Sequence, residues 1–346
     1  MEKKNLLQVL KLLRPALGSN IIKGLDSYIF TGNQVSAFNG SLCMTACLDE
    51  IFPVTGAIVG EPLVKLLSEL DKEIELTAPD ANTLLIKAGR SRTKFPVEQV
   101  DTSYLQDLEE TTAVNLPTQV MFAAGVKRCM TSLVGKGATL ENAGIHIFIE
   151  NDECRMYSTN NSTFSRFVFP LTGMSPISMF LPATFCEVLL AVYAELGTEP
   201  ETIIATDKYI RARFGNLTVR NSFYANPVNT DLRNLIDAGV TDVAIVDLPK
   251  ALSEAIKHSE VITNEGVVSV SWIGEQGKMF INAQGSKSQE LVEEIELAYP
   301  GTGELKFDIK NLRKVMDTCK EIGFGDDYML LIGAEKYFDH VVMSRQ

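Results

Sequence analysis

Residues 63–70 read LVKLLSEL, and the spacing of their four leucines decides the fold. The leucines fall at i, i+3, i+4 and i+7, which places them on one face of a helix. The same apolar spacing returns 122 residues further along, in FCEVLLAV at 185–192, and after another 127 residues, in LRKVMDTC at 312–319. Each run follows a short apolar stretch and precedes a pair of β-like segments. A pattern that returns at a nearly fixed interval indicates a repeated structural unit.

The rest of the chain fits three such units. Three further segments have helical spacing, 2–17, 118–134 and 248–262, and other short segments are typical of strands. These strand segments are 27–30, 35–38, 83–88, 145–149, 210–214, 217–219, 267–272, 279–282, 329–332 and 340–343. The order predicts an α+β fold of three repeated domains, each with two helices on one face of antiparallel sheets. Polar stretches at 109–114 and 237–241 suggest the boundaries 1–113, 114–238 and 239–346.

Charge is distributed unevenly between the expected helices and the remaining residues. The expected helices, extended to 2–17, 61–72, 118–136, 182–197, 248–262 and 308–322, together carry a net charge of +4. The remaining residues therefore carry −16 of a chain whose net charge is −12. Helices on one face of the sheets would then form a basic surface on an acidic protein, which is typical of a protein that holds a polyanion at one defined face.

Catalytic and metal-binding motifs are absent from the sequence. The three histidines have no metal-ligand spacing, and no nucleophile elbow, phosphate-binding loop or dinucleotide fingerprint occurs. The six cysteines are scattered, without a Cys-x-x-Cys pair, and are expected to be buried free thiols in a reducing compartment. A binding scaffold without a cofactor is therefore favoured over an enzyme. An enzyme would need a convergent polar cluster, such as Cys43 and Cys47 with a distant histidine.

The first residues and the hydropathy of the chain predict its location. Residues 1–18 have a basic start and several leucines, but Lys11 and Arg14 interrupt the apolar residues and no small-residue cleavage site follows. This pattern is typical of an amphipathic helix and not of a signal peptide. No apolar run reaches the length needed to span a membrane. We therefore expect a cytoplasmic protein without a membrane partner.

Three stretches resemble a known family. Residues 84–92, LLIKAGRSR, with Phe95, are similar to a strand and a Ser-Gly-Arg-Ser-like turn that close the first domain of the bacterial-type DNA sliding clamp, the beta subunit of DNA polymerase III. Residues 341–343, VVM, resemble the end of that family's chain, and 261–265, VITNE, resemble a segment of its third domain. The resemblance spans the whole chain, although none of these stretches is a catalytic signature.

The resemblance implies a function in DNA replication. Two copies would join head to tail, and their six domains would close into a ring with helices along the central hole. Each chain would be half of that ring. The ring would slide on double-stranded DNA without sequence specificity and tether the replicative polymerase and the clamp loader. It would be a processivity factor and not an enzyme.

The resemblance also implies three sets of site residues. The basic residues expected to face DNA are Lys4, Lys11, Arg14, Lys23, Lys127, Arg128, Lys136, Lys257, Lys310, Arg313 and Lys314. The expected walls of the client-peptide pocket are Thr159, Asn161, Ser162, Thr163 and Phe164 on one side and Val341, Val342, Met343 and Arg345 on the other. The expected dimer contact consists of Tyr104, Leu105, Leu108, Val261 and Ile262. Ordinary burial in a domain core is an equal alternative for Val261 and Ile262.

The sequence departs from the family at the expected client pocket. The usual Thr-Asp-Gly-His-Arg run is replaced by Thr-Asn-Asn-Ser-Thr at 159–163, and the chain ends Met-Ser-Arg-Gln at 343–346. A divergent clamp from a bacteriophage or mobile element would explain the difference. The alternative function is a DNA-binding ring or scaffold that has no polymerase clients, and a titration with a clamp-binding peptide separates the two hypotheses.

Overall fold

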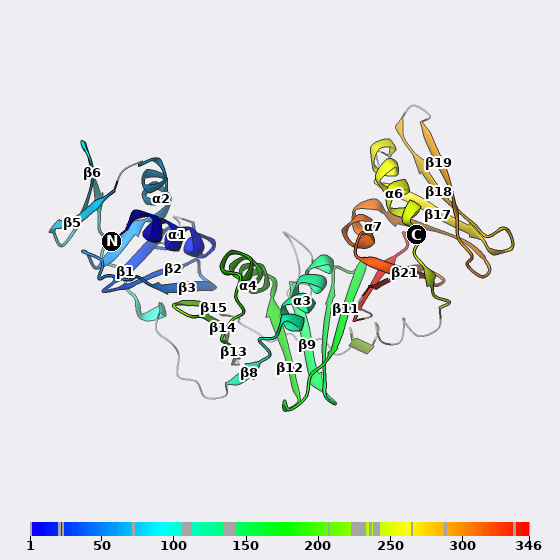
Figure 1. Ribbon diagram of the computed structural model, residues 1–346, viewed down its shortest axis with the longest axis horizontal. Coiled ribbons are helices and arrows are strands. Elements are labelled where there is room, and N and C mark those ends of the chain that lie inside the picture. Colours follow the sequence, from blue (N-terminus) through cyan, green and yellow to red (C-terminus); the bar gives the residue numbers. More distant parts are fainter. Residues whose placement is uncertain are drawn as a thin grey trace. The chain divides into compact units, whose positions relative to one another are not determined.

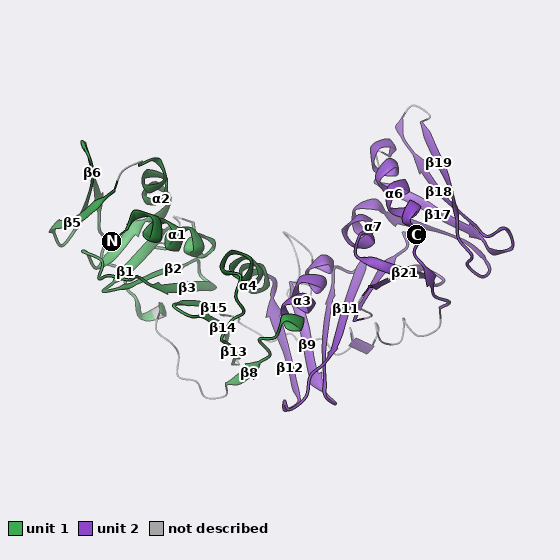
Figure 2. Cartoon of the chain, in the orientation of Figure 1, with its two compact units in different colours: residues 1–122, 184–226 green, residues 123–183, 227–346 purple. Residues whose placement is uncertain are grey.

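The computed structural model contains two compact units (Figures 1 and 2), Met1–Phe122 with Thr184–Asn226 and Ala123–Ala183 with Pro227–Gln346. The residues that the structure describes are 2–19, 22, 24–70, 73–105, 113–133, 143–206, 208–222, 233–234, 237, 243–263, 266–286, 289–334 and 337–345.

The first unit is built on an eight-stranded antiparallel sheet with the order β4-β1-β2-β3-β15-β14-β13-β8. Two segments far apart in the sequence meet in the middle of this sheet, where β3 pairs with β15 and Met44 lies opposite Val219. The strand bounds are β1 Ser27–Thr31, β2 Gln34–Phe38, β3 Leu42–Cys47, β4 Gly56–Val59, β8 Val114–Leu116, β13 Thr202–Ala205, β14 Tyr209–Phe214 and β15 Leu217–Ser222.

Three helices of the first unit bury an apolar stripe. In α1 (Lys3–Leu13) the buried residues are Leu6, Leu10 and Leu13, and the Tyr28 hydroxyl of β1 donates a hydrogen bond to the carbonyl of Leu10 at 2.6 Å. In α2 (Gly60–Glu69) and α4 (Ala183–Leu196) the leucine and FCEVLLAV runs supply the buried faces. Helical periodicity in the sequence therefore corresponds to burial in the structure, as expected for amphipathic helices.

The second unit contains an eight-stranded antiparallel sheet with the order β12-β9-β10-β11-β23-β22-β21-β16. Its seam is β11–β23, where Phe167 lies opposite Phe338. The strand bounds are β9 Gly144–Glu150, β10 Glu153–Thr159, β11 Thr163–Pro170, β12 Ile177–Pro182, β16 Val246–Asp247, β21 Cys319–Phe324, β22 Tyr328–Gly333 and β23 Phe338–Met343.

The helix α3 (Val120–Cys129) and the 3-10 turn that follows it pack closely on this sheet. A Cβ atom on Gly125 would lie 2.7 Å from the sulfur of Met156 and 2.8 Å from the ring of Phe167, so only glycine allows this approach. At the end of the helix, the Ser158 hydroxyl donates to the carbonyl of Cys129 at 2.6 Å. The face of the sheet that carries Met156, Ser158 and Phe167 is therefore the helix-covered face.

Two smaller sheets complete the structure. The first unit also contains β5 (Glu75–Asp80), β6 (Thr83–Ala88) and β7 (Ser91–Pro96) in that order. The second unit contains β17 (Val267–Ile273), β18 (Lys278–Gln284), β19 (Glu290–Glu296) and β20 (Thr302–Asp308) in the order β19-β18-β17-β20. The helix α6 (Lys250–Ile262) packs on β18 and β19 and against α7 (Ile309–Met316).

The order of elements confirms the predicted α+β fold and its repeat. The series helix, four strands, helix, three strands runs three times, from α1 to β7, from α3 to β15 and from α6 to β23. The second and third copies are each preceded by a short strand, β8 and β16. Within the described residues each copy has two helices. The boundary expected at 238/239 lies outside those residues.

The prediction of a helix over 308–322 was wrong beyond Met316. The hydroxyl and the amide of Thr318 both donate to the carbonyl of Val315, at 2.8 and 2.9 Å, and end the helix. Cys319 then begins β21, which pairs with β22 on one side and β16 on the other. The fourth member of the LRKVMDTC pattern is therefore a strand residue. Sheet pairing here overrides a local spacing that is typical of a helix.

Candidate functional site

The exposed face of α1 carries the first set of expected DNA-facing residues. Lys4 and Lys11 are exposed on the side of the helix opposite the buried leucines, and α1 contains no acidic residue. The Lys3 ammonium instead donates a hydrogen bond to the carbonyl of Leu70. Arg14 forms an exposed ion pair with Glu61 at 2.8 Å. Of these cations, Lys4 and Lys11 are the best placed to meet an external anion.

A groove of about 790 Å³ lies between α1 and α4 in the first unit. Lysines of α1 stand along it and apolar residues of both helices line most of its surface. The lining residues are Lys3, Lys4, Leu7, Gln8, Lys11, Leu12, Pro15, Val188, Ala191, Val192 and Glu195.

In the second unit, α3 and α7 carry basic residues over the same face of the eight-stranded sheet. Lys127 of α3 is exposed, and the guanidinium of Arg128 lies 5.6 Å from the ring centre of Phe338. All three charged residues of α7, Lys310, Arg313 and Lys314, are basic and exposed. Phe338 lies on the helix-covered face, so the cationic side chains of α3 and α7 share one surface of this unit.

Two of the expected DNA-facing residues have acidic neighbours across the α6–α7 contact. Arg313 forms an ion pair with Glu260, and the ammonium of Lys257 lies 3.8 Å from a carboxylate oxygen of Asp317. These pairs reduce the charge that either cation presents to a ligand. Lys23 and Lys136, the loop cations of the sequence prediction, lie outside the described residues.

Beneath α3 and α7 lies a buried polar cluster around His340 of β23. The hydroxyl of Ser165 lies 2.8 Å from Nδ1 of His340 and 2.7 Å from the hydroxyl of Ser132, while Nε2 of His340 has no hydrogen-bond partner among the described residues. Burial lowers the pKa of His340 to about 3, and the charge of Lys314 acts in the same direction. The imidazole is therefore neutral at neutral pH and links the helical layer to the β11–β23 seam.

The two expected walls of the client pocket are adjacent at this seam. Thr163 lies opposite Val342, Phe164 lies opposite Val341, and the amide of Met343 donates to the carbonyl of Ser162 at 2.9 Å. Because strand residues alternate between faces, Phe164, Val341 and Met343 share the face away from the helices. Thr163 and Val342 point to the helix-covered face and are at most 1% exposed.

The turn before Phe164 is held by its own side chains. The side-chain oxygen Oδ1 of Asn160 accepts from the amides of Ser162 and Thr163 at 2.9 and 2.7 Å, and the Thr159 hydroxyl accepts from the amide of Asn161 at 2.9 Å. Asn161 has a φ of 70°, which asparagine tolerates better than most residues. The Thr-Asn-Asn-Ser-Thr run is therefore well suited to a tight turn. At the other wall, the guanidinium of Arg345 lies 3.1 Å from Asp308.

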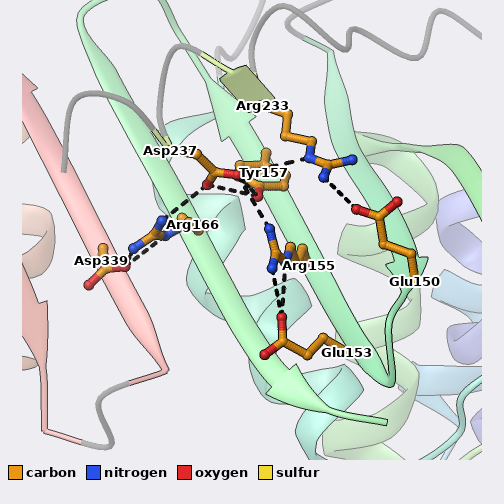
Figure 3. A network of polar contacts seen from close by, with 8 residues as sticks. All are labelled: Glu150, Glu153, Arg155, Tyr157, Arg166, Arg233, Asp237 and Asp339. Atoms are coloured by element: carbon orange, nitrogen blue, oxygen red, sulfur yellow. Dashed lines mark hydrogen bonds and ion pairs between the residues drawn. The ribbon is translucent and has the colours of Figure 1, made fainter. Parts of the chain in front are cut away.

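A network of charged residues covers the same outward face beside these walls (Figure 3). Asp237 accepts hydrogen bonds from the Tyr157 hydroxyl and from Arg166, both at 3.0 Å, and lies 3.5 Å from Arg155. Arg166 also bridges the seam by donating to Asp339 at 2.8 Å. The remaining members are Glu150, Glu153 and Arg233.

This network holds the local structure in place. Burial raises the pKa of the Tyr157 hydroxyl well above its ordinary value, and the adjacent Asp237 carboxylate adds to the rise. Tyr157 is therefore a hydrogen-bond donor at neutral pH. Half-buried carboxylates and guanidiniums that satisfy one another in this way fix geometry more than they add stability. The network fastens Asp237 to the outward face of β10 and β11.

The expected dimer residues lie in two places. Leu105 is half-buried at the end of a 3-10 turn, and Leu108 and the side chain of Tyr104 lie outside the described residues. Val261 is 83% exposed at the end of α6, which excludes the alternative that it belongs to a domain core of the chain. Ile262 is half-buried.

Two charged edge strands were missed by the sequence analysis. The sheet edge β7 directs Arg92 and Lys94 outward, whereas β19 directs Glu290, Glu294 and Glu296 outward. Residues 290–296, ELVEEIE, do not alternate strictly between Glu and apolar residues, and Leu291 and Ile295 have helical spacing, so the strand gave no clear signal.

The described residues give no support to a metal-dependent enzyme. No group of three or more His, Cys, Asp or Glu side chains among them could hold a metal ion. All six cysteines are free and all but Cys47 are buried, as predicted. None of the helices that the structure describes is long and apolar enough to cross a membrane.

Comparisons with known proteins give a fold but no sequence family. No protein-family model matches the sequence, and no curated protein matches it. Solved structures match over the whole chain. A DNA polymerase III subunit beta from Pseudomonas aeruginosa is 17% identical with a TM-score of 0.83, covering 100% of this chain and 99% of that one.

Two further matches come from distant bacteria. A DNA polymerase sliding clamp from Caulobacter crescentus is 16% identical with a TM-score of 0.83, and a DNA polymerase III beta chain from Streptococcus pneumoniae is 16% identical with a TM-score of 0.82. In both cases the match covers 100% of this chain and 98% of the other. The chain therefore has the fold of the bacterial DNA sliding clamp from end to end, which confirms the predicted fold class.

Proposed function

We propose that the chain is a DNA sliding clamp, a non-catalytic processivity factor that closes into a ring with a second copy and encircles duplex DNA. One observation carries the proposal. In a chain of net charge −12 with this fold, the helices α1, α3 and α7 contain three, two and three lysine or arginine residues and no acidic residue. Basic side chains on helices can follow phosphates without reading bases, which is what sliding requires.

The strongest candidates for phosphate contact are the exposed cations of these three helices, Lys4, Lys11, Lys127, Lys310 and Lys314. Arg14, Lys257 and Arg313 already have acidic partners and would contribute less. Arg128, stacked over Phe338, would contribute mainly through packing. This ranking refines the expected set, and Lys23 and Lys136 remain candidates from the resemblance alone.

Closure of the ring follows from the repeat, with clamp domains 1–113, 114–238 and 239–346. Each domain has two half-sheets, and halves of successive domains join at β3–β15 and at β11–β23. The halves left over are β5-β6-β7 and β19-β18-β17-β20. The equivalent third joint pairs β19 with β7 of a second copy, and two such joints close a ring of two chains.

The β3–β15 joint supplies a register for this third joint. Counted from its two-residue turn, Arg92 of β7 is equivalent to Thr218 of β15, which lies opposite Thr45 of β3. Counted from the preceding hairpin, Glu294 of β19 is equivalent to Thr45. In this register Arg92 would lie opposite Glu294, whereas the β11–β23 joint, counted in the same way, would place Arg92 opposite Val292, two residues away.

Charge also selects which edge takes part. The three-stranded sheet has a second edge, β5, whose outward residue Glu75 is acidic. Pairing β5 with β19 would oppose like charges, which destabilises a cross-strand pair, whereas β7 opposes unlike charges. Val261 and Ile262, at the end of the helix that covers β19, would add apolar contact with Leu105 and its neighbours.

A client site at the β11–β23 seam is the remaining part of the proposal. Phe164, Val341 and Met343 give an apolar strip on the outward face, with Arg345 beside it. An extended peptide from the replicative polymerase or the clamp loader would dock apolar anchors there. Thr159, Asn161 and Ser162 would shape the turn at one end, while Thr163 and Val342 support the strip from the buried face.

The test is topological. Purified protein is loaded onto nicked circular DNA and passed through a sizing column, and the DNA is then linearised. We expect retention on the circle and release from the linear molecule, because a ring leaves DNA only at an end. Equal retention on both forms would refute sliding. If the ring is retained but no clamp-binding peptide binds, the protein is a DNA ring without polymerase clients.

A further inference from the structure

In the second and third copies of the repeat a short strand pairs with the outer edge of the fifth strand, whereas the described residues of the first copy contain no such strand. In the second copy β13 is covered by β8, and in the third copy β21 is covered by β16. In the first copy the equivalent strand is β5, and no strand among the described residues pairs with its outer edge. The repeat therefore contains a position for one more strand that the described part of the first copy leaves open.

The open position can be located residue by residue. Leu76 of β5 lies opposite Ile86 as Ile203 of β13 lies opposite Ala212. Ile203 is also paired with Leu116 of β8 and is 1% exposed, whereas Leu76 is only half-buried. In the second copy Leu116 of β8 lies beside Ile203. No residue of the described first copy occupies the equivalent place beside Leu76.

The length of the open edge matches the strand that covers its equivalent. The covering strand β8 pairs with β13 over three residues. In β5 the regular register runs over Glu75, Leu76 and Thr77 and then shifts before Asp80. Pro79 lacks a backbone N–H and so prevents a longer ladder. An added strand would pair over about three residues, as in β-strand addition.

The side chains of β5 define the partner. Leu76 points toward the core with Ile86, so the residue opposite it should be apolar. Glu73 and Glu75 are exposed, and Glu75 forms an ion pair with Lys87 of β6 at 3.0 Å. Two copies of this edge would bring like charges together, which disfavours self-pairing. A lysine or arginine opposite Glu75 would instead form a favourable cross-strand pair.

We propose that the outer edge of β5 binds an extended segment of a partner protein in which apolar residues alternate with lysine or arginine. The segment adds as a fourth strand and places an apolar side chain beside Leu76. This site is separate from the β7 edge and from the β11–β23 seam, so a partner held here leaves both available.

The test uses the full chain and a synthetic ten-residue peptide in which valine alternates with lysine. Peptide binding is measured by fluorescence anisotropy and located by hydrogen exchange of the backbone amides. We expect exchange to slow at those amides of residues 75–77 that face away from β6, because the alternate amides already donate to β6. Because two favourable charge contacts become unfavourable, Glu73→Lys with Glu75→Lys should weaken binding by about tenfold.

The matched control is Glu199→Lys with Glu201→Lys. Glu199 and Glu201 are two residues apart, as Glu73 and Glu75 are, and they directly precede β13. Glu201 also forms an ion pair with Arg213, as Glu75 does with Lys87. The control should bind the peptide as the unmodified protein does, and a peptide with glutamate in place of lysine should not bind. The proposal is overturned if those amides of 75–77 that face away from β6 are already protected in the free protein. It is also overturned if the peptide protects another segment, or if both double variants lose binding equally.

Failure of this test would leave the proposed clamp function intact, because retention on circular DNA does not require the β5 edge. Conversely, binding at β5 would be measurable in a protein that never encloses DNA. The two proposals therefore succeed or fail separately.

Discussion

Reversing the charge of Arg92 tests the proposed closure of the ring most directly. In the register taken from the β3–β15 joint, Arg92→Glu sets a carboxylate opposite Glu294 of the second copy and diagonal to Glu296. Loss of an attractive cross-strand pair and gain of a repulsive one together cost about 1–2 kcal/mol. The substitution lies on an exposed edge strand, so the fold of the chain should be unaffected.

The ring contains the joint twice, so the cost for the dimer is about 2–4 kcal/mol. The dimer dissociation constant should therefore rise by about 30-fold to about 1,000-fold. Sedimentation equilibrium over a range of protein concentrations at low salt measures this change. Lys208→Glu, which makes the same change of charge on an exposed residue outside the joint, should dimerise like the unmodified protein.

The compensating exchange decides whether the register is correct. Glu294→Arg alone should also weaken the dimer, although it additionally loses the 2.6 Å ion pair of Glu294 with Lys278. Combining it with Arg92→Glu restores an attractive pair and should recover much of the affinity. If Arg92→Glu leaves the dissociation constant unchanged, or if the double variant is no tighter than either single one, the proposed joint is wrong.

Three further predictions concern DNA, pH and clients. Lys11→Ala should lower the slope of log affinity against log salt by about 0.9 for each DNA phosphate that the lysine neutralises, measured by filter binding, with Lys208→Ala unchanged. The pKa of His340 is about 3 in the folded protein against 6.5 in the unfolded protein, so between these values only the unfolded state binds a proton and acid favours unfolding. Urea melts should show the free energy of unfolding falling by about 1.4 kcal/mol per pH unit from pH 6 to 4. In His340→Asn the free energy of unfolding should fall less steeply. Phe164→Ala should weaken the binding of a polymerase-derived peptide by about 2 kcal/mol or more, as measured by calorimetry. The control variant Phe280→Ala should leave the binding of the peptide unchanged.

Local patterns predicted the helices well and the strands incompletely. The leucines of α1 and the FCEVLLAV run of α4 are buried as their spacing indicates, because one helix face is decided by residues a few positions apart. The LRKVMDTC run failed at its last residue, where the Thr318 side chain ends the helix and β22 recruits Cys319. The same three or four apolar positions are compatible with either structure until a partner strand is present.

The expected sites show the same division. The Thr-Asn-Asn-Ser-Thr departure at 159–163 was visible in the sequence, but its effect was not, because the turn depends on hydrogen bonds that two backbone amides donate to the side chain of Asn160. Val261 could not be assigned to a core or to a surface from its neighbours alone. The network around Asp237 joins residues from β10, β11 and β23 that share no motif, and therefore gave no signal.

By itself, the sequence determined that this protein is a threefold repeat of amphipathic helices and strands, with its positive charge concentrated on helices. Both properties depend on the spacing of residues a few positions apart and on the charges within each segment, which can be read locally. Only the tertiary structure decided which strands join the repeats, which edges remain, and which cations already have acidic partners. Those features depend on hydrogen bonds and ion pairs between segments far apart in the chain, such as β3 with β15 or Arg313 with Glu260, whose pairing no local pattern specifies.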